Sequence, residues 1–424
     1  MSKKIVILGA GYAGISVAKE LEKYYARNQD IEIKLIEKNS YHTLLTELHE
    51  VAGGRVLPNA VQVDLNRIFK SNIVDVIQDE IVSIDFDSQK LFSNNHEYTY
   101  DYLVLSTGSR PCCFNLPGVN EYAYQLWSHK EAIILRNHIY NCFQKASTIT
   151  DREERKKLLT FVIAGGGFTG VELAGELGEW KNKLCKQFSI NVEEVNIYLV
   201  EALPNILNIL DKNLAKKCEA RLKKIGINVL TECGIKSVDK DSIYLSNEEK
   251  IEGTLIWTAG IQGNPFIGEM DIKCDRRFRV EVNDYMQSIQ YKNVFCAGDT
   301  ISHICDGKPL PQVVETALQT GSCVAKNIIN IINGKEIRPF NPNYHGVLVS
   351  VGFSYAVAKV MGVKCSGIVA SALKHMVNIH YLYLIGKLSL VMDYIKHQFL
   401  QKRYCTELNV SLPVEAEGIK EPGF

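Results

Sequence analysis

The sequence predicts an α/β protein with two doubly wound units and a C-terminal amphipathic region. A short apolar run, a glycine loop and a helical stretch follow one another at residues 4–24, and the same order recurs at residues 160–180. Buried strands that alternate with helical patterns predict parallel sheets covered by helices. The C-terminal region differs, because apolar and basic side chains are mixed from Leu373 to Arg403.

Composition and charge narrow the class of protein. The 424 residues can bury more than one core, and 46% of them are hydrophobic, as in a folded globular chain. Lys+Arg and Asp+Glu balance at 48 each, so no overall positive field exists to hold nucleic acid. The 12 cysteines contain no C-x-x-C pair, which argues against a zinc or dithiol centre and for reduced thiols. From this cysteine spacing we expect no metal. A strand at residues 4–8 leaves no room for a targeting segment, so we expect a cytoplasmic protein.

The first glycine loop reads Gly9-Ala10-Gly11-Tyr12-Ala13-Gly14 and stands between a strand and a helix. In a dinucleotide-binding loop the first glycine allows a tight turn, the second lets the backbone approach the pyrophosphate, and the third brings helix and strand together. The helix N-terminus then faces the phosphate charge. Glu37 ends the next strand, where a carboxylate can accept hydrogen bonds from a ribose diol. The sequence therefore predicts a dinucleotide site.

The second glycine loop reads Gly165-Gly166-Gly167-Phe168-Thr169-Gly170, in the same context. Its acid is Glu201, at the end of the following strand. The spacing exceeds the roughly 20 residues expected, which fits an extended helix and loop across residues 181–194. A carboxylate here repels a 2′-phosphate, and residues 202–209 contain no arginine to accept one. We therefore expect NADH rather than NADPH.

Asp299 indicates which dinucleotide is a flavin. It ends a buried strand that begins at Asn293, and a helical pattern from Val313 to Ile332 follows. An aspartate at a strand end and a helix N-terminus can bond to the ribityl chain of a flavin held by the first loop. A plain helix N-cap is the alternative interpretation.

These motifs, together with the run Asp101 to Gly108, resemble in order the two-dinucleotide flavoprotein superfamily of the glutathione-reductase-like type. Within it, the segment Asn39 to Gly54 resembles the one after the FAD acid in type II NADH:quinone oxidoreductases. The run Gly167 to Glu172 resembles the second loop of the same family, where the glutamate lies near the flavin and quinone.

The resemblance implies a domain organisation, an activity and a set of contacts. It implies a discontinuous FAD-binding domain at residues 1–116 and 271–340, an NADH-binding domain at 117–270 and membrane-associating helices at 341–424. It also implies hydride transfer from NADH to FAD and then two electrons to a membrane quinone of the menaquinone type, without proton pumping. The enzyme would be a homodimer of the respiratory chain, attached peripherally to the cytoplasmic face of the cell membrane. The cofactor contacts that we expect are Gly9, Gly11, Tyr12, Ala13, Gly14, Glu37, Lys38, Thr46, Thr107, Gly108, Gly298, Asp299, Gly165, Gly167, Phe168, Thr169, Gly170, Glu201 and Gly260.

Quinone reduction consumes protons, and a buried carboxylate with a raised pKa can supply them. Glu172 and Glu315 are the candidates, and the resemblance adds Gln319 and places Lys374 near the quinone. The family's Ala-Gln-x-Ala-x-Gln motif is Val-Glu-Thr-Ala-Leu-Gln here, so Glu315 replaces the first glutamine. The alternatives are a helix-start glutamate favoured by the helix dipole for Glu172, and a solvated helix residue for Glu315.

Two other functions stay open. Sulfide:quinone reductase shares the fold and acceptor but needs cysteines beside the flavin, for which Cys142, Cys296 and Cys365 are available. A redox sensor that binds FAD and NAD without quinone turnover is the non-enzymatic alternative. A dithiol reductase is disfavoured, because residues 40–60 contain no cysteine.

In the C-terminal region no apolar run reaches the roughly 18 residues of a spanning helix. The mixture of apolar and basic residues predicts helices in the bilayer interface, divided at Gly386, with Tyr381, Tyr383 and Tyr394 at the boundary. A buried core or dimer helix pair is the alternative. We expect a loose acidic tail after Leu412.

Overall fold

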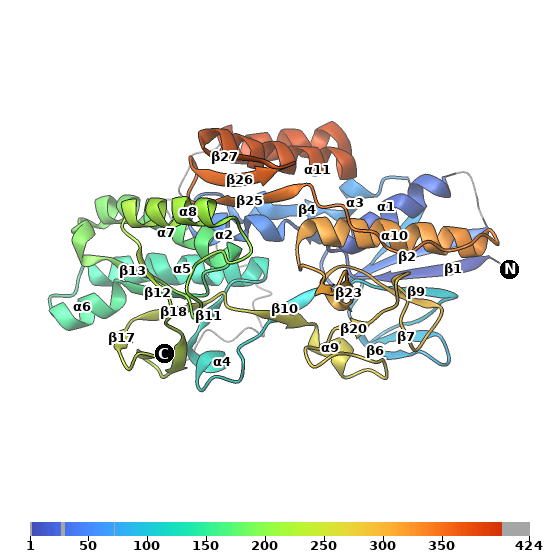
Figure 1. The fold of residues 1–424 in the computed structure, drawn as a ribbon, viewed down its shortest axis with the longest axis horizontal. Coiled ribbons are helices and arrows are strands. Elements are labelled where there is room, and N and C mark those ends of the chain that lie inside the picture. The colour runs from blue at the N-terminus through green and yellow to red at the C-terminus, as the bar shows by residue number, and fades with distance from the viewer. Residues whose placement is uncertain (1, 27–29, 72, 401–424) are drawn as a thin grey trace. The chain divides into compact units, whose positions relative to one another are not determined.

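The computed structural model describes residues 2–26, 30–71 and 73–400. The contacts divide the chain into two compact units (Figure 1). Unit 1 comprises Met1–Thr43, Gln62–Arg110 and Ile261–Tyr344, and unit 2 comprises Leu44–Val61, Pro111–Gly260 and His345–Phe424. The division into FAD, NADH and membrane domains stays a prediction.

Unit 1 is built on a parallel sheet with the strand order β21-β9-β1-β2-β5. The strands are β1 (Lys3–Leu8), β2 (Ile31–Glu37), β5 (Val74–Gln78), β9 (Tyr102–Leu105) and β21 (Val294–Cys296). Ile5 and Ile7 are buried and pair in register with Ile33 and Leu35. Helices α1 (Tyr12–Tyr24) and α10 (Val314–Ile332) pack against each other. The doubly wound unit predicted for the N-terminal half is confirmed.

Smaller elements complete unit 1. They are β3 (Tyr41–Thr43), β4 (Gln62–Asp64), α3 (Leu65–Ile68), β6 (Ile81–Asp85), β7 (Lys90–Ser93), β8 (Glu97–Thr99), β10 (Ser109–Pro111), β19 (Ile261–Gly263), α9 (Pro265–Gly268), β20 (Val280–Glu281), η4 (Gly298–Thr300), β22 (Ile301–Ser302), β23 (Ile304–Cys305) and β24 (Lys308–Pro309). The strands β6, β7 and β8 form an antiparallel sheet, and β3 pairs with β4.

Unit 2 contains a second parallel sheet, in the order β11-β18-β12-β13-β14. The strands are β11 (Tyr124–Gln125), β12 (Thr160–Ala164), β13 (Asn196–Val200), β14 (Asn228–Leu230) and β18 (Thr254–Trp257). Every residue of β12 and β18 is buried, as expected of central parallel strands. The helices of this unit include α5 (His129–Ala146), α7 (Phe168–Phe188) and α8 (Lys212–Lys224). Ser128 and Glu131 form a capping box that fixes the start of α5.

The other elements of unit 2 are η1 (Leu45–Glu47), α2 (Leu48–Ala52), η2 (Pro58–Val61), α4 (Val119–Tyr122), α6 (Arg152–Leu158), η3 (Val192–Glu194), β15 (Ile235–Val238), β16 (Ser242–Leu245) and β17 (Lys250–Glu252). Two glycines allow close packing around α7. A Cβ on Gly53 would lie 2.4 Å from Glu176 Cβ, and one on Gly175 would lie 2.4 Å from the backbone nitrogen of Gly352. Because neither position has room for a side chain, α2 and the turn after β25 (Gly346–Ser350) can approach α7 closely.

The C-terminal part of unit 2 is an antiparallel sheet of β25, β26 (Ala356–Val360) and β27 (Val363–Gly367), on which α11 (Ile368–Ile395) packs (Figure 1). Ala370 and Leu373 of α11 contact Ala356 and Ala358 of the sheet. A non-helical residue, Lys387, with φ +61°, divides α11 one residue after the predicted break. A π-helical turn, η5 (Lys396–Leu400), follows. Lys402, Arg403 and the acidic tail lie outside the described residues.

Candidate active site

The first glycine loop has the geometry that a dinucleotide loop needs. Gly9, after β1, has φ +101°, a conformation that glycine adopts readily. A Cβ on Gly14 would lie 1.9 Å from the carbonyl oxygen of Gly9, so only glycine lets α1 approach the strand. A Cβ on Gly11 would meet no atom within 4 Å. The second glycine thus leaves open space beside the N-terminus of α1, where a phosphate can approach the backbone.

The second loop repeats this geometry in unit 2. Gly165 has φ +106°, and a Cβ on Gly170 would lie 1.9 Å from its carbonyl oxygen. A Cβ on Gly167, the N-cap of α7, would meet nothing within 4 Å. Both loops therefore fit the phosphates of a dinucleotide.

The two predicted acids occupy matching positions. Glu37 accepts a hydrogen bond from the N–H of Ala10 at 2.8 Å, and Glu201 accepts one from the N–H of Gly166 at 2.6 Å. Each carboxylate therefore bonds to the residue after the first loop glycine. The second oxygen of Glu201 accepts from the N–H of Leu203 at 2.8 Å. Both acids stand at the loop, where a ribose diol would lie in a bound dinucleotide.

A side-chain hydroxyl group fixes the conformation of each loop. Neither hydroxyl residue was predicted from the sequence. Ser106 Oγ lies 2.9 Å from the carbonyl oxygens of the last residue of β1 and of the first loop glycine. Thr258 Oγ1 lies 2.7 Å from the carbonyl oxygen of Ala164, the last residue of β12, and 3.4 Å from that of Gly165. The signal in the sequence is a hydroxyl residue at a strand end, two positions before a glycine. It occurs at Ser106-Thr107-Gly108 and again at Thr258-Ala259-Gly260.

Asp299 lies in η4 rather than at the start of an α-helix, because α10 begins only at Val314. The N-cap interpretation of Asp299 is wrong, since the N-cap residues are Ala297 for η4 and Val313 for α10. Burial raises the pKa of Asp299, against the hydrogen bond at 2.6 Å from Ser109 Oγ.

Polar groups next to Asp299 and Ser109 in the chain also fit a ligand. Thr107 Oγ1 is buried and has no hydrogen-bond partner among the described residues. The N–H of Gly108 donates to Thr300 Oγ1 at 2.9 Å. A buried hydroxyl without a partner is costly, so a polar cofactor group at this turn would stabilise it.

The remaining predicted cofactor contacts have varied surroundings. Tyr12 and Ala13 are buried in α1, and the Tyr12 ring packs edge-on against His42 at 4.9 Å. Lys38 is half-exposed and pairs with Glu80 at 3.8 Å. Others are set by backbone position: Gly298 (φ +72°) in η4, Gly260 (φ +82°) after β18, Phe168 and Thr169 in the first turn of α7, and Thr46, which is exposed in η1 of unit 2.

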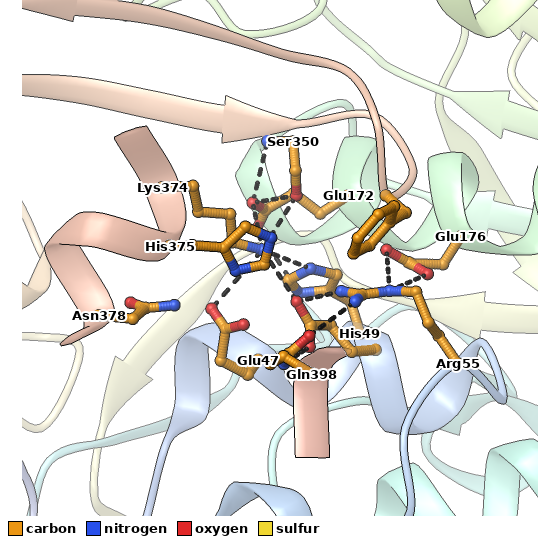
Figure 2. Close-up of polar contacts among 12 residues, drawn as sticks. Glu47, His49, Arg55, Glu172, Glu176, Ser350, Lys374, His375, Asn378 and Gln398 are labelled. Atoms are coloured by element: carbon orange, nitrogen blue, oxygen red, sulfur yellow. Dashed lines mark hydrogen bonds and ion pairs between the residues drawn. The ribbon is translucent and has the colours of Figure 1, made fainter. Parts of the chain in front are cut away.

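Unit 2 also contains a buried ionic cluster, shown in Figure 2. It comprises Glu47, His49, Glu50, Arg55, Glu172, Glu176, Ser350, Lys374 and Gln398. At one end stands the ammonium of Lys374, which lies within 4.0 Å of five partners: His49 Nε2 (3.1 Å), Ser350 Oγ (3.1 Å), Glu50 (3.2 Å), Glu47 (3.5 Å) and Glu172 (4.0 Å). The cluster therefore joins α2, α7, β25 and α11, and brings together the predicted pair Glu172 and Lys374.

At the other end stands Arg55, which follows α2. Its Nε donates to both carboxylate oxygens of Glu176, at 3.1 and 2.9 Å. Nη1 donates to Gln398 Oε1 at 2.8 Å, and Nη2 pairs with Glu50. The guanidinium also lies 5.2 Å from the ring centre of Phe353. Each of the three guanidinium nitrogens of Arg55 thus has a partner, and the side chain is only 3% exposed.

Glu172 is the carboxylate of the cluster that reaches furthest toward solvent. Its side chain is 13% exposed, against 1% or less for Glu47, Glu50 and Glu176. The N–H and Oγ of Ser350 donate to it, at 3.2 and 3.0 Å. Burial raises the pKa of Glu172, and the charge of Lys374 opposes this rise. A raised pKa is what the sequence analysis expects of a proton donor.

Two neighbouring glutamates of the cluster have pKa values shifted in opposite directions. Burial and the adjacent Glu50 hold the pKa of Glu47 well above its usual range, although the charge of Lys374 opposes this rise. Although burial opposes ionisation of Glu50, Arg55 and Lys374 hold its pKa well below the usual range. The same burial therefore shifts the pKa values of these two carboxyls in opposite directions, because Glu50 lies against two cationic groups.

The other charges of the cluster follow from the same surroundings. Although burial disfavours the ammonium of Lys374, Glu47, Glu50 and Glu172 raise its pKa. Burial raises the pKa of Glu176 to about 7, against the charge of Arg55. Lys374 therefore stays cationic, and Glu176 can exchange a proton near neutral pH.

The other two predicted catalytic residues belong to unit 1. Glu315 is half-buried in the first turn of α10. Gln319, one turn later, donates to the carbonyl of Asn343 at 2.8 Å and accepts from its N–H at 2.9 Å. The structure therefore groups the four residues as two pairs, one in each unit, and their catalytic roles stay predictions.

Two glycine loops of equal geometry, each at the end of a parallel sheet, define an oxidoreductase of the two-dinucleotide class. The chain matches the model of the Pyridine nucleotide-disulphide oxidoreductase family over residues 3–321. It is also 30% identical over 394 residues to the "Type II NADH:quinone oxidoreductase" of Staphylococcus aureus strain NCTC 8325 / PS 47, covering 92% of this chain and 97% of that relative. The chain belongs to the type II NADH:quinone oxidoreductase family.

Solved structures agree on the fold. The structure of NDH2 from Plasmodium falciparum in complex with NADH matches with a TM-score of 0.83 at 19% identity, over 94% of this chain and 99% of that one. The sulfide:quinone oxidoreductase from Aquifex aeolicus matches with a TM-score of 0.73 at 17% identity, over 96% of this chain and 98% of that one. The predicted fold class is confirmed.

Proposed function

We propose that the chain oxidises NADH and reduces a quinone, with FAD as its flavin. The observation that carries this proposal is the repeated geometry of the glycine loops. In each unit, open space lies beside the second glycine of the motif, Gly11 or Gly167. The family to which the chain belongs, and the NADH bound in the Plasmodium falciparum NDH2 structure, support the same donor and acceptor. Glu201 at the second loop favours NADH over NADPH, because a carboxylate repels a 2′-phosphate.

The residues of the chain bind, orient and manage protons. FAD, once bound, would supply the redox chemistry by accepting a hydride from NADH and passing two electrons to the quinone. The N-termini of α1 and α7 would hold the pyrophosphates of the two dinucleotides, and Thr107 and Asp299 would offer polar groups to the flavin. Glu172, at the edge of the buried ionic cluster, donates a proton to the quinone. The ammonium of Lys374 then stabilises the carboxylate that remains after the proton has left.

The exposed face of α11 supports peripheral attachment to a membrane. Lys374 and His375 are buried, whereas Met376, Val377 and Leu384 are each more than half exposed. This inverts the usual pattern of a surface helix, so the outer face is apolar. Within the described part of the chain, Ile368–Leu400 is the one helical stretch long and apolar enough to cross a membrane by length and composition. Because Lys387 breaks it, we infer that the two halves lie in the bilayer interface.

Finer features rest on the family alone. We infer a menaquinone-type acceptor, a homodimer, a place in the respiratory chain and attachment to the cytoplasmic face, without proton pumping. The sulfide alternative gains no support from the cysteines. Cys142 and Cys296 are buried, Cys365 is half-buried in β27, and each described cysteine is a free thiol.

The test is an assay of the purified protein. We expect a flavin absorbance spectrum whose extracted cofactor is FAD, and NADH oxidation that depends on menadione or a ubiquinone analogue. Glu172→Gln should slow quinone reduction about a hundredfold, because general acid catalysis contributes on this order. Turnover with sulfide in place of NADH would support the sulfide reductase instead. Cofactor binding without quinone turnover would support the redox sensor.

A further inference from the structure

The turn between β26 and β27 carries a residue that does not favour the turn. Val360 pairs with Val363, so Met361 and Gly362 form a two-residue turn. Both have positive φ, +48° and +84°. Turns of this kind favour Asn or Asp followed by Gly, because the left-handed region suits glycine and short polar side chains. A long apolar side chain at Met361 therefore costs conformational energy and needs another reason.

Burial within the unit does not supply that reason. Met361 is 81% exposed and Val363 is 70% exposed, so the two apolar side chains stand in the solvent at the end of the hairpin. Contact with a partner or a lipid phase would bury both side chains and would account for methionine at a position that disfavours it.

The next pair of residues along the hairpin, Lys359 and Lys364, also points to a partner outside the unit. Lys359 and Lys364 lie directly opposite each other across the hairpin. Like charges in this position destabilise a sheet. Lys364 is compensated by Asp211 at 2.7 Å, and Lys359 is exposed. An anionic partner would therefore stabilise Lys359, and a lysine side chain can reach phosphate groups while its stem lies along an apolar phase.

The hairpin belongs to the sheet on which α11 packs (Figure 1). The apolar face of α11 begins at Ile368 and Val369, which are 73% and 65% exposed and directly follow β27. The strand β27 therefore connects the turn directly to the start of the helix face that is assigned above to a membrane.

We propose that the tip of this hairpin, Met361 to Val363, inserts into an anionic lipid bilayer as an anchor separate from α11. The inference rests on the proposed membrane attachment of the enzyme. It assigns the apolar turn to the acyl boundary, and Lys359 to the headgroup phosphates.

The experiment measures flotation of the flavin-loaded protein with phosphatidylcholine vesicles, with and without phosphatidylglycerol. Met361→Asn should weaken binding to anionic vesicles about tenfold, the cost of one apolar side chain that is no longer inserted. Asparagine favours the left-handed turn, so the midpoint of thermal unfolding should stay the same or rise. Lys359→Glu should weaken binding only to the anionic vesicles. The matched control is Ile304→Asn, because Ile304 is 68% exposed on another hairpin, in unit 1.

The outcomes separate the hairpin from the enzyme's function. Menadione reduction by Met361→Asn should equal that of the wild type, since this acceptor needs no membrane. If the wild type floats and Met361→Asn floats equally well, the hairpin is not an anchor. A changed oligomeric state of Met361→Asn with unaltered flotation would assign the tip to a second copy of the chain and overturn the inference. A wild type that never floats would overturn the membrane attachment as well, while NADH oxidation would still stand or fall on its own assay.

Discussion

At the scale of single residues, the buried ionic cluster shows how environment separates two identical side chains. Glu47 and Glu50 are three positions apart, and both are buried. Glu50 has two cationic partners, Arg55 and Lys374, and also accepts from Gln398, whereas Glu47 has the ammonium of Lys374 at 3.5 Å as its cationic partner. A buried carboxylate with one cationic partner costs more than a neutral acid, so we expect the proton to stay on Glu47 rather than on Glu50. Sequence alone offered no means to tell which of the two is charged.

We predict opposite sensitivity of these two positions to the same substitution. Glu50→Gln should destabilise the protein by about 3 kcal/mol, because it removes the carboxylate that pairs with the buried charges of both Arg55 and Lys374. The matched variant Glu47→Gln should change stability by less than about 1 kcal/mol at acidic pH, because it replaces a neutral group by a neutral group. Urea unfolding followed by circular dichroism measures both, and equal losses would contradict the charge assignment.

Glu47 should also affect how stability depends on pH. A carboxyl with a raised pKa binds its proton more tightly in the folded state than at its ordinary pKa of 4.5. Its contribution to stability is therefore fully present below that value and is lost as pH rises through the raised pKa. We expect the urea midpoint of Glu47→Gln to overtake that of the wild type as pH increases from about 5 upward. Parallel profiles for the two proteins would show that Glu47 does not hold this proton.

At the scale of elements, each glycine loop assigns one physical task to each glycine. The first adopts a positive φ, the third lets the helix approach the strand, and the second faces open space. These tasks predict different outcomes for the same mutation. The sequence showed the spacing of the glycines, and the hydroxyls of Ser106 and Thr258 that fix the loops became visible only in the fold.

We predict that Gly167→Ala and Gly170→Ala separate binding from folding. At Gly170 the new Cβ would overlap a carbonyl oxygen at 1.9 Å, so the variant should lose about 3 kcal/mol of stability or fail to fold. At Gly167 the Cβ meets no protein atom, so stability should be retained while it intrudes on the phosphate position. Isothermal titration with NADH should show at least about a tenfold loss of affinity for Gly167→Ala. Unchanged affinity for NADH in a folded variant would show that this loop does not bind the phosphates of NADH.

At the scale of the whole molecule, α11 has two roles that depend on opposite faces. Its inner face contributes Lys374 to the buried ionic cluster, and its outer face is apolar and exposed. A deletion of α11 would therefore destroy the cluster together with any membrane contact. Substitutions on the outer face address the membrane alone.

We predict that Met376→Ser combined with Leu384→Ser releases the enzyme from anionic vesicles. These side chains are 57% and 54% exposed, so their replacement should leave thermal stability and menadione reduction close to those of the wild type. The loss of two inserted side chains should weaken vesicle binding about a hundredfold. Retained binding in a stable double variant would favour a protein partner for this face, as in the dimer alternative for the segment.

The sequence by itself determined the paired dinucleotide folds, because strand periodicity and glycine spacing are local properties that dictate the turn geometry. It also identified Glu172 and Lys374 through family motifs. Only the tertiary structure decided that α2, α7, β25 and α11 meet in one buried cluster, that burial raises the pKa of Glu47, and that Lys374 faces inward while Met376 faces outward. Charge state and burial depend on partners far apart in the chain, so no local pattern can specify them.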